Sequence, residues 1–319
     1  MVERRPTVAA ADFFMAAIVV VGAAMSGLGL LASVVPALEL TNHFRPATLA
    51  GCLAATVLTW LLRKRHAARL LMTMACLNAG IMAIVCNMAA STKIDSSTGT
   101  SAKRQLKLLT FNVFGANERL PEAARWILDQ NPDVVVLQEM TWRSKPKLLP
   151  LLELAYPHIH DCRCNDIVIA AKKPFMDSGG QTRTAFVPSW SWIEFADGSA
   201  GRLRIVGLRP YYAYRPNEQA VQYQWIENEL AGLKQPVVVI GDFNLTPWSW
   251  KLFRLGYRTG LVRHGTWARS WPAQDNWPNI PAFLIDNVMT SPQIKSVWFA
   301  TGPRLGSDHL PVVATVQLP

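Results

Sequence analysis

Hydrophobic residues follow two different patterns along this 319-residue chain. Up to Ala90, long uncharged runs alternate with short polar segments. From about residue 106 onward, apolar residues form short runs that are separated by turn residues, with charges throughout. The first pattern is typical of membrane helices and the second of a soluble domain with many short strands.

Three long apolar runs, at residues 13–35, 47–62 and 70–90, predict membrane-spanning helices. At about 1.5 Å per residue, the first and third can cross a hydrocarbon core of roughly 30 Å, whereas the second is short. A cleaved secretory signal followed by buried helices is the alternative. The first run is longer than a signal core and two more follow it, so we predict a transmembrane region of three spans within residues 1–90.

Basic residues flank these runs unevenly. Arg4 and Arg5 precede the first span, and the basic segment Arg63–Arg69 joins the second to the third. Short basic flanks remain in the cytoplasm. We therefore expect the amino terminus inside a cytoplasmic membrane and everything beyond Ala90 outside it.

Residues 91–105 are rich in Ser and Thr, which predicts a linker that tethers rather than packs. Residues 106–319 have the size of one soluble domain. The net charge of +10 favours polyanions, but lipid headgroups and nucleic acids are both polyanionic, so the charge does not choose between them.

Short apolar runs within residues 106–319 predict many strands with few helices between them. Helical spacing is found at residues 120–130 and 217–233. Strands are expected within residues 105–114, 131–140, 166–175, 203–210, 236–244, 282–291 and 310–319. This pattern favours an α/β fold in which two mixed β-sheets pack as a four-layer α/β sandwich, preceded by three transmembrane helices, over a single doubly wound sheet.

Acids, amides and one histidine lie at the ends of these apolar runs. They are Asn112, Glu139, Asp242, Asn244, Asp286, Asp308 and His309. Alone, each also fits a structural role, such as a solvated strand end or a turn acid. Together they supply oxygen ligands for a divalent cation, amides that orient water, and a histidine for proton transfer or phosphate contact.

Five motifs carry a family resemblance: TFNVFG, VVVLQEM, VVVIGDFNLTP, FLIDNVMTS and GSDHLPVVATV, in this order. With them, roughly residues 106–319 resemble the endonuclease/exonuclease/phosphatase superfamily. The three spans ahead of GDFNLTPWSW are also similar to bacterial members that are grouped with glycopeptide-resistance membrane proteins. The resemblance implies a metal-dependent phosphoric ester hydrolase, a phosphodiesterase or phosphatase, of the bacterial inner membrane.

The resemblance also implies a metal site. Glu139 would bind the catalytic Mg²⁺, or Mn²⁺, with Asn112 and Asp308 near it. Such an ion stabilises the charge that develops on a phosphoryl group during in-line hydrolysis.

Four further residues receive catalytic roles from the resemblance. Asp242 would polarise the attacking water, and Asn244 would orient that water or the phosphate. His309, paired with Asp286, would contact the phosphoryl oxygen or act as the base, because a neighbouring acid fixes the tautomer of an imidazole and raises its basicity.

One position departs from the family pattern. Many members have a second histidine where this chain has Leu208 and Arg209. An arginine cannot act as a base near neutral pH, but it can hold a phosphate with two donors. Arg209 is therefore our candidate substrate-binding residue, and a surface arginine packed on Tyr211 or Tyr212 is the alternative.

The segment HIHDCRC places His158, His160, Cys162 and Cys164 at alternate positions. In a strand the first and last would lie about 20 Å apart, too far to share one zinc ion. We expect these residues to be structural, and the cysteine positions indicate no disulfide framework.

The predicted function is hydrolysis of a phosphate ester at the outer face of the cytoplasmic membrane, with a lipid-linked or phospholipid substrate. An extracytoplasmic metal-dependent nuclease is the alternative. A third reading, a membrane protein that kept the fold and lost turnover, is disfavoured by the intact acids and His309. Tryptophans between Trp248 and Trp277 fit either a core or a membrane-interface role.

Overall fold

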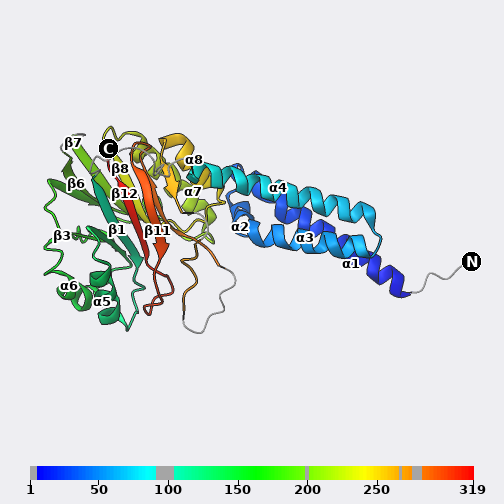
Figure 1. Cartoon of the computed structure of the whole chain (residues 1–319), viewed down its shortest axis with the longest axis horizontal. Helices are drawn as coiled ribbons and strands as arrows, with labels where there is room; N and C mark the ends of the chain where they lie inside the picture. The colour runs from blue at the N-terminus through cyan, green and yellow to red at the C-terminus, as the bar shows by residue number, and fades with distance from the viewer. Residues whose placement is uncertain (1–5, 91–103, 198–200, 266–267, 275–281) are drawn as a thin grey trace, which may run out of the picture.

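The computed structural model describes residues 6–90, 104–197, 201–265, 268–274 and 282–319. Figure 1 shows an elongated molecule with a helical bundle at one end and a sheet domain at the other. The bundle contains α1 (Pro6–Gly27), α3 (Arg45–Leu61) and α4 (Arg65–Ala90). Between α1 and α3 lie η1 (Leu28–Ser33), η2 (Pro36–Leu38) and α2 (Glu39–His43).

Two helical segments of the described chain are long and apolar enough to cross a membrane, Asp12–Ser33 and Arg65–Cys86. They overlap the first and third predicted spans. The second predicted span falls in a bent pair, Pro36–His43 and Arg45–Leu61, whose two parts meet at 61°. A full crossing by this pair, and with it a third span, stays a prediction. The segment Pro36–Phe44, which we call the elbow, ends at this bend.

The described part of the second domain holds two six-stranded sheets. The first has the order β11-β12-β1-β2-β4-β3 and the second β5-β6-β7-β8-β10-β9. The strands are β1 (Gln105–Asn112), β2 (Val134–Gln138), β3 (His158–His160), β4 (Val168–Ala171), β5 (Asp177–Gln181), β6 (Ser189–Asp197), β7 (Gly201–Arg209), β8 (Val237–Asp242), β9 (Val262–His264), β10 (Asp286–Thr290), β11 (Lys295–Thr301) and β12 (Val312–Gln317). Strands β1 and β2 are parallel, as are β7 and β8, whereas the other pairs are antiparallel. Both sheets are therefore mixed, as predicted.

Side chains that alternate along the strands build the layers. Leu108 of β1 faces the core between the two sheets, together with residues such as Ile205 and Ile240. Leu109, its neighbour, faces outward and packs under α5 (Leu120–Gln130) and α6 (Lys145–Leu152). Helices α7 (Pro216–Ala231) and α8 (Trp250–Thr259) cover the outer face of the second sheet. The predicted α/β sandwich is confirmed.

The linker expected at residues 91–105 lies almost entirely outside the described residues, and its last residue, Gln105, already begins β1. The two domains are also in direct contact. Nδ1 of His43 in the elbow lies 3.0 Å from Oγ1 of Thr246 in the segment after β8. Oε1 of Glu39 accepts a hydrogen bond of 2.9 Å from the backbone N–H of Trp250. Both acceptor residues of the elbow are buried, so this contact is a packed interface.

The expectation about the cysteines is wrong in one respect. Cys162 and Cys164, two residues apart, are joined by a disulfide. The pair closes a loop after β3, where the chain has already left the strand, so the strand spacing assumed from the sequence does not apply. His158 and His160 lie in β3 and contribute to no metal cluster within the described chain.

Candidate active site

The predicted site residues gather at one edge of the two sheets. Asn112 ends β1, and Asp242 ends β8. Asp286 begins β10, which runs antiparallel to β8, so that Asp286 and Asp242 are partners in register. His309 precedes β12, which is antiparallel to β1. Asp286 begins its strand, and Asp308 and His309 precede theirs, but antiparallel pairing brings them to the same edge as Asn112 and Asp242.

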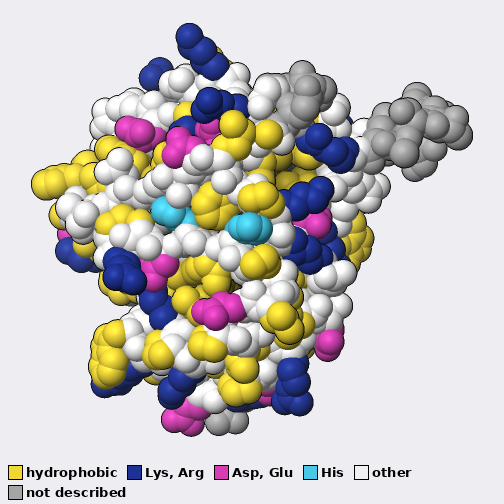
Figure 2. Space-filling view, turned by 90° about the vertical axis from the view of Figure 1, so that its left-hand side faces the viewer, with side chains coloured by type: hydrophobic (Ala, Val, Ile, Leu, Met, Phe, Trp, Pro, Cys, Tyr) yellow, Lys and Arg dark blue, Asp and Glu magenta, His cyan; other side chains and the backbone are white. Residues whose placement is uncertain are grey.

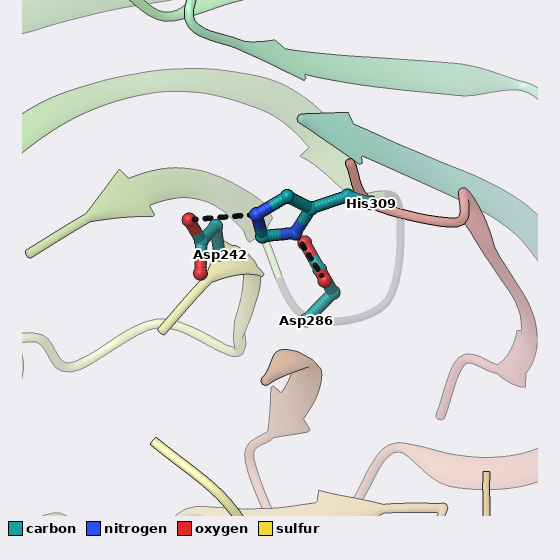
Figure 3. Close-up of side chains that lie close together, drawn as sticks. All are labelled: Asp242, Asp286 and His309. Carbon is teal, nitrogen blue, oxygen red and sulfur yellow. Dashed lines mark hydrogen bonds and ion pairs between the residues drawn. The ribbon is translucent and has the colours of Figure 1, made fainter. Parts of the chain in front are cut away.

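Figure 3 shows His309 between Asp286 and Asp242. Nδ1 of His309 lies 2.8 Å from Oδ2 of Asp286, and Nε2 lies 3.9 Å from Oδ2 of Asp242. All three side chains are buried. Burial opposes the charged imidazole, but the charges of Asp286 and Asp242 outweigh it and raise the pKa of His309. The imidazolium form is therefore favoured at neutral pH.

The same surroundings act on the carboxyl of Asp242. Burial raises the pKa of Asp242, and the nearby charge of His309 partly opposes that shift. A carboxyl whose pKa moves toward neutrality is a better proton acceptor than an ordinary surface acid. Asp242 has the properties of a general base.

Asn112 connects the two sheets. Its Nδ2 atom lies 3.1 Å from Oε1 of Glu139 and 3.1 Å from Oδ2 of Asp242. The Oγ of Ser307 donates to the backbone carbonyl of Asn112 at 2.7 Å and accepts the N–H of His309 at 3.0 Å. One amide thus holds Glu139, Asp242 and the His309 segment in register with one another.

Two site residues have an unusual backbone. Glu139 has φ 57° and Asn244 has φ 51°, which lie in the left-handed region that residues other than Gly rarely occupy. Asn244 donates from its backbone N–H to Oδ1 of Asp242 at 2.9 Å and from Nδ2 to the carbonyl of Pro210 at 3.0 Å. Strain of this kind persists where surrounding contacts fix a functional side chain.

Arg209 lies inside the site and is only 3% exposed. Its Nη2 is 2.5 Å from Oε1 of Glu139 and donates to the Tyr212 hydroxyl at 2.7 Å, and its Nη1 is 2.7 Å from Oδ2 of Asp166. The alternative of a surface arginine is therefore wrong, although the ring of Tyr212 does lie beside the guanidinium, 5.4 Å away.

Asp166 is the acid that sequence reasoning missed. It precedes β4, and its Oδ1 atom is buried without a hydrogen-bond partner among the described residues. An acid before an apolar run is a weak signal, because acids are common in the turns that precede strands. Asp166 reaches the site because β4 runs antiparallel to β2, just as Asp286 reaches it because β10 runs antiparallel to β8.

The donor set at this edge fits a divalent cation. Oδ1 of Asp308 and Oδ1 of Asp286 are buried and have no hydrogen-bond partner within the described chain. Polar atoms of Asp242, Asp286 and His309 lie within 4.8 Å of one another, but a protonated His309 has no free nitrogen for a metal ion, so the carboxylates are the candidate ligands. Carboxylate oxygens without partners in a buried site are what a hard cation satisfies. Of the predicted ligands, Glu139 is bonded to Asn112, and Asp308 has the unpartnered Oδ1 atom.

Two paths lead from the elbow to this site. Thr246, which contacts His43, is two residues beyond Asn244. On the other side, Phe44 packs edge-on against Phe283 with ring centroids 5.4 Å apart, and Trp271 stacks on Phe283. Nε1 of Trp271 donates to Oδ2 of Asp308 at 3.3 Å. Residues next to Asn244 and Asp308 therefore link the catalytic edge to the elbow.

Solved structures share this fold at low sequence identity. An endonuclease/exonuclease/phosphatase protein from Bacteroides vulgatus matches with a TM-score of 0.57 and 18% identity, covering 68% of this chain and 100% of the other. One from Beutenbergia cavernae matches with a TM-score of 0.53 and 19% identity, covering 68% and 72%. TDP2 of D. rerio, complexed with a single-strand DNA product, gives 0.55 and 16%, covering 67% and 99%.

No curated protein matches the chain. The sequence model of the Endonuclease/Exonuclease/phosphatase family matches residues 109–309, which include every predicted site residue. The match begins within β1 and ends at His309. The chain belongs to the endonuclease/exonuclease/phosphatase family, and it is a metal-dependent hydrolase of phosphoric esters.

Proposed function

We propose that this protein is a Mg²⁺-dependent phosphoesterase that hydrolyses a phosphate ester of a lipid-linked or phospholipid substrate at the outer face of the bacterial cytoplasmic membrane. Mn²⁺ is the alternative ion. The observation that carries the proposal is the contact between the elbow and the catalytic edge, through Thr246 on one side and Phe283 on the other.

The elbow joins hydrophobic segments that are candidates for membrane spans, so its depth is that of the headgroup layer. A site that is packed against the elbow is held at the same depth. Substrates that already lie in the membrane then meet it at a high effective concentration, whereas a soluble polymer reaches it only by diffusion. This favours a membrane substrate over DNA.

In this proposal Glu139 holds the metal ion, with Asn112 and Asp308 beside it. A bound Mg²⁺ supplies positive charge next to the phosphoryl oxygens. Asn112 also fixes the rotamer of Glu139 through its Nδ2 contact. Glu139 is 20% exposed on its side chain, so it remains accessible to an ion and a substrate from outside.

Asp242 accepts the proton of the attacking water, since burial has raised its pKa. Asn244, which is held by Pro210 and Asp242, orients that water or the phosphate. His309 in its protonated form donates to a phosphoryl oxygen, and Asp286 keeps it protonated and oriented. Each of these residues thus contributes one step of the hydrolysis.

Arg209 is placed to bind the phosphate in this proposal. In the described structure its guanidinium already pairs with Glu139 and Asp166. A guanidinium has five N–H donors, so it can keep Asp166 while turning donors toward a phosphate. Asp166 then acts as the anchor that sets its position.

The extracytoplasmic nuclease remains the competing function. Figure 2 shows the face of the sheet domain that is turned away from the helical bundle, where Lys and Arg side chains are interspersed with Asp and Glu. A continuous basic stripe, which is the usual footprint of a nucleic-acid surface, is not seen on that face.

A hydrolysis panel tests the proposal. The full-length protein in detergent or nanodiscs, with Mg²⁺, is offered phospholipids, prenyl pyrophosphates, and single- and double-stranded DNA at matched phosphate concentration. We expect faster release from a membrane-embedded ester than from DNA. Preferential cleavage of DNA that is lost in Asp242→Asn would reject the lipid substrate and establish the nuclease.

A further inference from the structure

A second potential binding site lies where the helical bundle meets the sheet domain. A cavity of about 170 Å³ lies between the end of α4, α8 and β9. Its apolar lining includes Val85, Leu252, Phe253, Leu261 and Met289. An apolar cavity of roughly 150 Å³ is large enough for benzene, so this one has room for a short length of acyl chain.

One charged side chain, Arg263, lines the same cavity. It is 8% exposed, and its Nη2 atom has no hydrogen-bond partner among the described residues. Its Nη1 atom donates to the carbonyl of Gly265. No carboxylate in the described chain forms an ion pair with it, and burial lowers the pKa of Arg263 to about 10. A buried cation without a counter-charge is costly, which makes an anion the natural occupant.

The position of Arg263 separates this cavity from the catalytic edge. Arg263 pairs in register with Met289 of β10, three residues along the strand from Asp286. At about 3.3 Å per residue, this is roughly 10 Å from the catalytic carboxylate. The cavity opens beside α4 instead, where Val85 contributes to its wall.

Helix α8 borders the cavity and carries aromatic and basic side chains on its outer face. Its N–H at Trp250 binds Glu39 of the elbow, so the helix lies against the ends of the membrane helices. Trp250 and Tyr257 are 38% and 79% exposed, and Arg258 and Arg254 are also exposed, the latter in an ion pair with Glu227. A helix with an apolar inner face and an aromatic and basic outer face is typical of the headgroup layer of a membrane.

We propose that this junction binds one anionic phospholipid, with its phosphate paired to the guanidinium of Arg263 and the beginning of an acyl chain in the cavity. Charge complementarity selects the occupant, since a zwitterionic headgroup brings its own cation to a place that already has one. The lipid is a bound ligand and is not hydrolysed there. The inference rests on the membrane placement proposed above and is independent of the reaction.

Native mass spectrometry of the full-length protein tests it. Protein in detergent micelles is titrated with phosphatidylglycerol or phosphatidylcholine, and bound lipids are counted. Wild type should retain one phosphatidylglycerol in preference to phosphatidylcholine. Arg263→Gln should weaken that binding by about tenfold, because a charge-assisted contact is lost. Arg163→Gln removes an exposed arginine from the loop after β3 and should change nothing.

A second variant guards against misfolding of Arg263→Gln. Val85→Trp fills the cavity from the α4 side and leaves the guanidinium intact, and it should also displace the lipid. Equal retention of both lipids by wild type, or unchanged phosphatidylglycerol retention in both variants, overturns the inference. Retention by a protein that hydrolyses nothing supports this lipid site while rejecting the proposed function, so the two failures are distinguishable.

Discussion

Nδ1 of His309 lies 2.8 Å from Oδ2 of Asp286, and the two residues come from segments that are 23 positions apart in the chain. Asp286 begins a strand of the second sheet, whereas His309 precedes a strand of the first. The pair therefore joins the two sheets across the catalytic edge. Its chemistry therefore depends on how the two sheets pack.

Asp286→Asn should lower kcat by about 10²-fold or more, because it removes the charge that keeps His309 protonated and oriented. KM should change little, since the amide keeps the shape of the site. Steady-state kinetics against the best substrate measure both. Asp177→Asn, an exposed acid of β5, is the matched control. A wild-type kcat in Asp286→Asn would remove His309 from the catalytic step.

Glu139→Gln should reduce metal-dependent turnover by about 10²-fold or more while the fold survives, because one charged ligand is lost and the shape is kept. Turnover is measured across a Mg²⁺ titration, with circular dichroism as the check on folding. Near wild-type turnover at saturating Mg²⁺ would show that Glu139 is not a ligand.

Arg209→Lys and Arg209→Ala should raise KM more than they lower kcat, because a ground-state clamp contributes mainly to binding. We expect a rise of about tenfold for Ala and less for Lys, which keeps the charge and loses the fork of donors. Arg202→Ala, on the exposed end of the same strand, should leave KM unchanged. A larger effect on kcat than on KM would assign Arg209 to the transition state instead.

His264 should make stability depend on pH. Burial and the charge of Arg263 lower its pKa from 6.5 to about 4 in the folded chain. The unfolded chain thus binds more protons between these values, and stability should fall as the pH drops from about 6.5 to about 4, by up to about 3 kcal/mol. Urea unfolding at pH 7 and pH 5 measures the slope. His264→Gln should reduce the slope by the contribution of this one residue, whereas His158→Gln should not change it.

A reporter that is active only outside the cytoplasm should be active when fused after Pro319. The expectation follows from the basic segment Arg63–Arg69, which stays inside, and from three crossings before Ala90. Fusion at His66, within that segment, provides the opposite control. A signal confined to the cytoplasm at Pro319 would reject the three-span topology and, with it, the outer-face substrate.

The strongly apolar strands were predictable because burial on both faces leaves a continuous hydrophobic run, as in Val237–Ile240. The edge strand β5 was missed, since its sequence, DSGGQ, has no apolar residue and pairs with β6 through backbone groups alone. Strand β11 was missed for a related reason, as none of its residues is buried. Edges of sheets carry weak sequence patterns.

For the site, the identities of the acids were predictable and their partnerships were not. The resemblance supplied Glu139, Asp242 and His309, but no local pattern indicates that Arg209 bridges Glu139 to Asp166, 43 residues earlier. The contact of His43 with Thr246 spans 203 residues. Such pairs depend on tertiary packing, which a single sequence does not encode in any local period.

The contact with the elbow fixes the position of the active site relative to the helical bundle. In the placement proposed above, the catalytic edge contacts the elbow at the bilayer surface, so Asn244 and Asp308 are held at a constant distance from that surface. The distance between the catalytic edge and the bilayer surface then selects the substrate. A scissile phosphate is within reach of the site only when its depth in the membrane matches that distance. Two lipids can share a phosphate linkage and differ in the length of the spacer between linkage and tail. The enzyme would distinguish them without any contact to the spacer.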